Sequence, residues 1–254
     1  MAVVFITAAA NNTGLAIAEK FASEGYCVAV SSRRMADAQK SAEYLRQKYG
    51  VKSVGYELEI TDVENIKKVF AEIKKDFGGL DIFVANAANL GVEMDFFAVD
   101  EKRYNEVVDC NLKGTFFCSQ QASLIMKEQN KGSIVFISSV HSHKCIFGRS
   151  LYTASKGGIN AFMRALAIEL GQYNIRSNCI IAGAIKTDRW NNFTDEQIKE
   201  KRANWPLGLE STGEDIANGV FYLGTDLSKT VTGTELTIDS GILNCLLPYK
   251  EMCK

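Results

Sequence analysis

The sequence is poor in residues that break or divide a fold. It contains only two prolines among 254 residues, Pro206 and Pro248, and both lie late in the chain. No linker rich in proline, glycine or serine separates one part from another, and no internal repeat of solenoid period is visible. The length is enough for one sizeable hydrophobic core. We therefore expect a single domain over residues 1–254.

An excess of charge of one sign and a long apolar run are also missing. With 29 basic and 30 acidic residues the net charge is −1, which argues against a broad attraction to nucleic acid or to an anionic membrane. No apolar run reaches the length of a membrane span. The apolar residues 1–10 lack the positive leading region of a signal peptide and are predicted to form a buried strand. We expect a cytoplasmic protein with no nucleic-acid or membrane partner.

Histidine is scarce, and the cysteines are not grouped. The sequence has two histidines and an odd number of scattered cysteines, none in a C-x-x-C pair. The seven cysteines are Cys27, Cys110, Cys118, Cys145, Cys179, Cys245 and Cys253. A zinc site or disulfide framework is therefore not expected. We predict free, buried thiols in a reducing compartment, and no bound metal.

What is present is an alternation of short apolar runs with longer amphipathic stretches. Strands are predicted at residues 3–7, 26–31, 53–58, 80–85, 134–137, 176–181 and 235–238. Helices are predicted at 15–23, 35–49, 61–76, 151–170 and 214–223, with two more between 101 and 129; the third helix is expected to begin with a capping box from Thr61 to Glu64. Several strands are apolar on both faces, which is typical of a parallel sheet covered by helices. The fold class is therefore α/β, with a doubly wound sheet that binds its ligand beyond the carboxyl ends of the strands.

The first candidate site follows the first strand, at Thr7-Ala-Ala-Ala-Asn-Asn-Thr-Gly14. A turn here places a helix N-terminus at the carboxyl edge of the sheet, where free amides suit a pyrophosphate. Gly14 would let the helix pack closely on the strand. The segment is poor in glycine, so a plain turn capped by Asn12 or Thr13 explains it equally well.

The second candidate site is Tyr152-Thr-Ala-Ser-Lys156. Residues four apart share one face of a helix, and Ile159 and Met163 continue that face. Tyr152 and Lys156 should therefore point at the sheet. An ammonium beside a phenol lowers the phenol's pKa from its usual ~10, which suits proton transfer. The alternative is an aromatic–cation pair on the surface.

Polar residues also stand near the ends of other predicted strands. Ser138 and Ser139 follow the fifth strand, Asn86-Ala87-Ala88 follow the fourth, and Asn111 lies further along. The Ser139 hydroxyl would donate a hydrogen bond to a substrate oxygen, whereas each asparagine alone is equally typical of a cap or turn. The order of these residues along the chain and their expected placement at one sheet edge both point to a single site.

From Val3 to about Gly241 the sequence resembles the short-chain dehydrogenase/reductase family. The most specific part is Ser139, Tyr152 and Lys156 in register, followed by Gly157-Gly-Ile-Asn-Ala-Phe162. The resemblance implies a Rossmann-like fold, with Tyr152 as catalytic acid/base and Lys156 binding the nicotinamide ribose and tuning Tyr152. It also implies that Ser139 orients the reacting oxygen and that Asn111 supports a water-linked proton path through Lys156.

The resemblance implies further cofactor and substrate residues. Besides Tyr152 and Lys156, the implied cofactor-binding residues are Thr7, Asn11, Asn12, Thr13, Gly14, Ser32, Arg33, Glu59, Ile60, Asn86, Ala87, Gly183, Ile185 and Thr187. Thr187 and the Ile185 backbone would hold the nicotinamide carboxamide. Residues 188–209 resemble the variable lid over the substrate, whose aromatic residues either line a pocket or pack the lid down. The expected substrate-pocket residues are Val140, His141, Phe147 and Trp190.

Several positions depart from the family pattern. Ala8, Asn12 and Ala88 replace usual glycines, Ala85 a usual asparagine, Ala182 a usual proline, and Glu59 a usual aspartate. Ala8 is small enough if its backbone angles are ordinary, and asparagine is the residue that, after glycine, best takes a left-handed conformation. We expect these changes to affect cofactor affinity more than the chemistry.

The end of the second strand indicates which cofactor is used. A carboxylate there would bind a ribose 2′-hydroxyl and repel a 2′-phosphate. Here Ser32 is followed by Arg33 and Arg34, and a hydroxyl beside a guanidinium suits a phosphate. We therefore expect a preference for NADP(H), with NAD(H) possible. The alternative is that the arginines are a solvated helix start, and Asn11 stands where a basic residue often helps hold the phosphate.

The predicted function is the reversible reduction of a carbonyl, or oxidation of a secondary alcohol, on a small molecule. One alternative is a non-catalytic nucleotide-binding or redox-sensing protein on the same fold, suggested by the sparse glycines. Another is a sugar-nucleotide epimerase or dehydratase, which shares the tyrosine–lysine pair but usually carries a longer substrate domain. By family likeness we expect a homo-oligomer, either tetramer or dimer.

Overall fold

A single seven-stranded sheet organises the protein. The computed structural model describes residues 1–91 and 95–252. Its strands are β1 (Val3–Ile6), β2 (Cys27–Ser32), β3 (Ser53–Glu57), β4 (Ile82–Ala85), β5 (Gly132–Ser139), β6 (Ile175–Ala182) and β7 (Glu235–Ile238). All neighbouring pairs are parallel, in the order β3-β2-β1-β4-β5-β6-β7. The direction of winding therefore reverses between β1 and β4, which confirms the predicted doubly wound α/β class.

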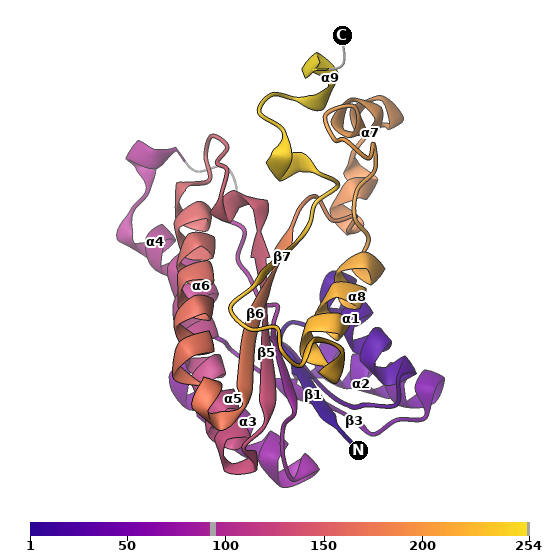
Figure 1. The fold of residues 1–254 in the computed structure, drawn as a ribbon, viewed down its shortest axis with the longest axis vertical. Helices are drawn as coiled ribbons and strands as arrows, with labels where there is room; N and C mark the ends of the chain where they lie inside the picture. The colour runs from indigo at the N-terminus through magenta and orange to yellow at the C-terminus, as the bar shows by residue number, and fades with distance from the viewer. Residues whose placement is uncertain (92–94, 253–254) are drawn as a thin grey trace.

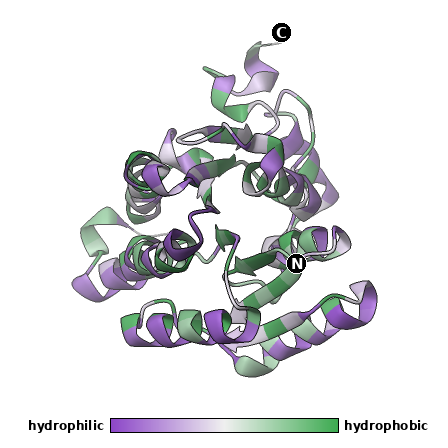
Figure 2. Ribbon diagram, turned by 60° about the horizontal axis from the view of Figure 1, so that its bottom comes forward, coloured by the Kyte–Doolittle hydropathy of each residue, from purple (hydrophilic) through white to green (hydrophobic). Residues whose placement is uncertain are grey.

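Helices cover both faces of this sheet (Figure 1). One face carries α1 (Asn12–Ser23), α2 (Met35–Tyr49) and α8 (Gly213–Gly224); the other carries α3 (Val63–Phe77), α4 (Glu101–Val108), α5 (Thr115–Gln129) and α6 (Ser150–Glu169). Figure 2 shows the polar sides of the outer helices turned away from the sheet. In β1, Val3 and Phe5 belong to one core while Val4 and Ile6 belong to the other. Burial on both faces explains why the strands are continuously apolar.

The start of α3 and the connection between α4 and α5 differ from the sequence prediction. The capping box expected from Thr61 is wrong, because Asp62 caps α3 by accepting from the backbone N–H groups of Glu64 and Asn65. The Thr61 hydroxyl donates instead to Glu59. The two helices predicted between 101 and 129 are α4 and α5, joined by a π-helical turn, η2 (Asp109–Gly114). Such turns often mark functional positions.

Beyond the carboxyl ends of the strands lie η5 (Asp188–Asn192), α7 (Asp195–Arg202) and the short C-terminal helix α9 (Tyr249–Met252), seen at the top of Figure 1. None of the helices in residues 1–91 and 95–252 is both long and apolar enough to cross a membrane. The six described cysteines are free, but Cys110, Cys145 and Cys245 are not buried. Cys253 lies outside the described residues.

Candidate active site

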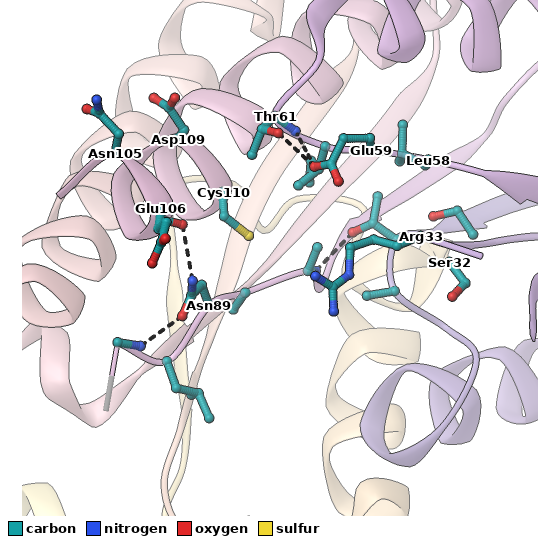
Figure 3. Close-up of a pocket in the computed structure, with 18 of the residues that line it drawn as sticks. Ser32, Arg33, Leu58, Glu59, Thr61, Asn89, Asn105, Glu106, Asp109 and Cys110 are labelled. Carbon is teal, nitrogen blue, oxygen red and sulfur yellow. Dashed lines mark hydrogen bonds between the residues drawn. The ribbon is translucent and has the colours of Figure 1, made fainter. Parts of the chain in front are cut away.

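A large cleft opens at the carboxyl edge of the sheet where the winding reverses. Its volume is about 1220 Å³. Six of the predicted cofactor residues line it, namely Thr7, Ser32, Arg33, Glu59, Ile60 and Ala87. In Figure 3 the Arg33 side chain reaches from the end of β2 into this cleft. Cys110 lines the cleft on the side opposite Arg33.

The turn between β1 and α1 contains two non-glycine residues with a positive φ. Asn12 has a φ of 47°, as its residue type allows, and Ala8 also has a positive φ of 52°. Ordinary backbone angles, the condition under which Ala8 would replace a glycine without strain, are therefore not met. Asn11 is the N-cap residue of α1, and its side chain makes no capping hydrogen bond. The plain capped turn is thus not formed, and the first amides of α1 have no side-chain cap.

Residues that directly follow β4 brace this turn. The Asn86 side chain donates to the carbonyl oxygens of Thr7 and Ala8, at 3.0 and 3.2 Å. The Thr7 hydroxyl accepts from the N–H groups of Asn86 and Ala87, both at 3.0 Å. Thr7 and Asn86 therefore join the two strands that flank the reversal point, and both side chains are occupied by backbone partners.

The tyrosine–lysine pair lies on the inner face of α6. Tyr152 and Lys156 are buried, at 7% and 2% exposure, as the helical spacing predicted. The Lys156 ammonium donates to the carbonyl of Ile137 at 2.7 Å and lies 5.6 Å from the centre of the Tyr152 ring. The Ser139 hydroxyl lies close enough to the Tyr152 hydroxyl to act on its pKa. Three groups able to donate or accept a proton therefore converge at the end of β5.

The electrostatics of this cluster differ from the sequence expectation. Burial raises the pKa of Tyr152, while the Ser139 hydrogen bond and the charges of Arg149 and Arg189 act to lower it. Lys156 is not among these influences, and burial lowers its own pKa to about 8. The prediction that the ammonium lowers the tyrosine pKa is wrong for the protein alone, because desolvation of the phenolate outweighs the nearby positive charges.

Comparisons with known proteins agree with this architecture. A family model described as enoyl-(acyl carrier protein) reductase matches residues 8–243. A sorbose reductase of Candida albicans is 34% identical over 94% of this chain and 86% of its own, and a 3-oxoacyl-(acyl-carrier-protein) reductase of Aquifex aeolicus is 35% identical over 94% and 96%. A Sinorhizobium meliloti structure described as a short-chain alcohol dehydrogenase superposes with a TM-score of 0.90 at 31% identity, covering 96% of this chain and 97% of that one. The chain belongs to the short-chain dehydrogenase/reductase family.

Membership of this family makes the protein an NAD(P)-dependent oxidoreductase. The relatives named above are reductases and a dehydrogenase, which argues against the non-catalytic alternative. The residues present fit such a cofactor. The uncapped start of α1 faces the reversal point, and a Cβ at Gly14 would lie only 2.4 Å from the Ala8 carbonyl oxygen and 2.8 Å from Asn86 Nδ2. The helix therefore packs closely on the turn at Gly14, although Ala8 and Asn12 in the same turn are not glycine.

Replacing Gly14 by alanine is expected to force α1 away from the turn. Because the added methyl group would strike backbone atoms of Ala8 and Ala9 as well as the hydrogen-bonded Asn86 side chain, we expect a loss of about 1–3 kcal/mol in unfolding free energy together with weaker NADPH binding. Urea unfolding and a fluorescence titration measure the two effects. Gly171→Ala is the matched control, because nothing lies within 4 Å of a Cβ at Gly171. Equal stability of the two variants would contradict this packing argument.

Asn111 lies in the π-helical turn and is fully buried. Its side-chain oxygen accepts from Asn89 N–H at 2.6 Å, and its amide group donates to the Asn89 carbonyl at 2.8 Å and to the Ser155 hydroxyl at 3.0 Å. No direct hydrogen bond joins it to Lys156 among the described residues. The sequence analysis missed Asn89 and Ser155, although a hydroxyl on the buried face of α6 signals a need for a partner.

The predicted substrate-pocket residues are not all gathered at one place. The His141 ring packs edge-on against Tyr152, with centroids 5.9 Å apart, and Val140 packs against the hydrophobic core. Phe147, in contrast, is 97% exposed. Trp190 is buried, donates from its indole to the Ile185 carbonyl at 2.9 Å, and contacts Phe193 and Trp205. Of the two roles predicted for the aromatic residues of 188–209, these contacts favour packing within that segment for Trp190.

The segment after β6 approaches the end of β7. A Cβ at Gly183 would lie 2.6 Å from Asp239 Cα, so only glycine fits there. Ile185 pairs with Ser211 as an isolated bridge. Thr187 caps η5 from its backbone without a side-chain hydrogen bond. Its hydroxyl is therefore not used to cap η5.

Proposed function

We propose that this enzyme reduces the carbonyl group of a small molecule reversibly, with NADP(H) preferred over NAD(H). The observation that supports it best is the cluster of Ser139, Tyr152 and Lys156 at the carboxyl end of β5. Asn111, Asn89 and Ser155 hold the π-helical turn against α6. The proposed cofactor-binding residues are those named from the sequence, and residues 188–209 form the proposed lid.

In this mechanism the protein's own groups manage the proton. When bound, the nicotinamide supplies the hydride in reduction and accepts it in oxidation. The Tyr152 hydroxyl donates its proton to the substrate oxygen, and the Ser139 hydroxyl holds that oxygen in place. A raised pKa keeps Tyr152 protonated near neutral pH, which is the form that reduction needs. Lys156, lodged against the Ile137 carbonyl, binds the ribose and replaces the spent proton from its ammonium group.

The activity is tested by mixing the protein and NADPH with ketoses, ketosteroids and 3-oxoacyl thioesters. The choice follows the relatives, which include the sorbose and 3-oxoacyl reductases and a 3α-hydroxysteroid dehydrogenase of Mediterraneibacter gnavus. Loss of NADPH absorbance with one class identifies the substrate class. No turnover with any carbonyl, in either direction, would contradict the proposed reaction.

The cofactor preference rests on the end of β2. Arg33 lines the cleft and reaches into it, whereas Arg34 is held by Asp37 at 2.6 Å. Glu59 hydrogen-bonds to Thr61, at 2.7 Å between Glu59 Oε1 and the Thr61 hydroxyl. A Yarrowia lipolytica relative, 32% identical, is named "probable NADP-dependent mannitol dehydrogenase". The position of Arg33 in the cleft and the likeness to this relative together support a 2′-phosphate site at Ser32 and Arg33.

Arg33→Ala is expected to weaken NADPH binding by about tenfold or more and to leave NADH binding unchanged, because a guanidinium–phosphate contact contributes about 1.5–3 kcal/mol. Titration with each cofactor measures the change. Arg34→Ala is the neighbouring control and should have the smaller effect, since Asp37 already engages that guanidinium. Wild-type protein that uses NADH as well as NADPH would overturn the preference.

We also propose that residues 1–254 act as one domain within a homo-oligomer. Exposed apolar side chains on α5 and α6 support an interface there, since Phe116, Leu124 and Ile168 are 42%, 53% and 84% exposed. Apolar side chains grouped on neighbouring helices are typical of surfaces that a partner covers.

A further inference from the structure

Asn12 and Asp188 connect two parts of the cofactor crevice by a reciprocal pair of hydrogen bonds. Asn12 Nδ2 donates to Asp188 Oδ2 at 3.2 Å, and the Asp188 backbone N–H donates to Asn12 Oδ1 at 3.2 Å. Asn12 begins α1, and Asp188 begins η5, the first helix of the proposed lid. We call this pair the Asn12–Asp188 clasp.

Other contacts hold the same segment, but from different sides. The backbone of Lys186 donates to the Ser211 carbonyl at 2.8 Å, and the Trp190 indole donates to the Ile185 carbonyl at 2.9 Å. These bonds fix the segment to the stretch before α8 and to the lid itself. Within residues 1–91 and 95–252, the clasp provides the only hydrogen bonds between residues 11–14 and 183–192. Without it, no hydrogen bond would connect the α1 turn with the start of the lid.

The clasp depends on a residue that departs from the family pattern. A glycine, which usually stands at position 12, has no side chain and cannot form it. Asn12 adopts a φ of 47°, a conformation that asparagine tolerates better than most residues but that still carries some strain. The side-chain hydrogen bonds to Asp188 offset that strain. Asn12 therefore makes hydrogen bonds that a glycine at this position could not make.

We propose that Asn12 is a positioning residue for the cofactor. The inference rests on the proposed function, in which the α1 turn receives the pyrophosphate and Thr187 holds the nicotinamide carboxamide. A cofactor bound in this way contacts both sides of the clasp. By fixing Asp188 to α1 before the cofactor arrives, the clasp reduces the ordering that binding would otherwise require.

Three variants separate this role from its alternatives. Asn12→Gly removes the clasp while keeping a residue that adopts positive φ freely. Asp188→Ala removes the acceptor of the Asn12 amide, and Asp188→Asn keeps an acceptor oxygen but removes the negative charge. We expect the Kd for NADPH to rise about fivefold in Asn12→Gly and Asp188→Ala, and Asp188→Asn to stay close to wild type. Tighter binding in both Asp188 variants would overturn the proposal, since it would show that the carboxylate simply repels the pyrophosphate.

Hydrogen exchange of the cofactor-free protein gives a second, independent measurement. Amides of residues 188–192 should exchange faster in Asn12→Gly and Asp188→Ala than in wild type, and at the wild-type rate in Asp188→Asn. Unchanged exchange in Asn12→Gly would overturn the clasp. Wild-type protein that binds neither NADPH nor NADH would instead contradict the proposed function, and the exchange rates would still decide whether the clasp holds the lid.

Discussion

Replacing Tyr152 by phenylalanine should lower kcat by about 10²–10⁴-fold, the usual contribution of a positioned acid or base, while NADPH binding stays near its wild-type value. The substitution removes one hydroxyl and nothing else. The ring keeps its place on α6 and its edge-on contact with His141 at 5.9 Å. The substrate oxygen then has the Ser139 hydroxyl as a hydrogen-bond donor but no group to supply a proton.

Steady-state rates with NADPH, a fluorescence titration of the cofactor and urea unfolding together measure this effect. Tyr222→Phe, at a tyrosine of α8 that is 40% exposed, is the matched control for the loss of a phenolic hydroxyl. A Tyr152→Phe protein that keeps more than a tenth of the wild-type rate would exclude Tyr152 as the acid/base. A protein that loses NADPH binding equally would indicate a structural role for the hydroxyl.

The parts of this site that follow from the sequence are those fixed by local periodicity. Strands apolar on both faces predict a covered parallel sheet, and Phe5 with its neighbours in β1 is buried as expected. Residues four apart share a helix face, which is why the burial of Tyr152 with Lys156 could be predicted. The placement of Ser139 beside them follows from the end of a strand that the same rules identify.

The parts that could not be predicted depend on contacts distant in the chain. The positive φ of Ala8 belongs to a turn whose carbonyl accepts from Asn86, 78 residues further on. The partner of Lys156 is a backbone carbonyl of another strand, at Ile137. Burial raises the pKa of Tyr152. The spacing of residues along a helix predicts which side chains are buried, but not how strongly the loss of water shifts a pKa. Tertiary contacts of this kind leave no local signal in the sequence.

Lys156→Met should remove activity and, at the same time, change how stability depends on pH. Burial lowers the pKa of Lys156 to about 8 in the folded protein, whereas an unfolded lysine titrates near 10.4, so between these values the unfolded chain carries a proton that the folded one has released. Stability of the wild type therefore gains up to about 1.4 kcal/mol per pH unit in that window, about 3 kcal/mol in all. Methionine has no such group.

The expected result is that the stability difference, Lys156→Met minus wild type, is constant below pH 8 and falls as the pH rises above it. Burial raises the pKa values of Cys118 and Cys179, so both proteins lose stability at high pH through these thiols. The Cys118 contribution cancels in the difference, which therefore reports Lys156 together with its electrostatic coupling to Cys179. Urea unfolding on both sides of pH 8 measures it, with Lys40→Met, at an exposed lysine of α2, as the control. A difference that is flat or rises with pH would contradict the buried charge. In the proposed mechanism this ammonium supplies the proton that Tyr152 passes to the substrate, a role that would offset its cost to stability at neutral pH.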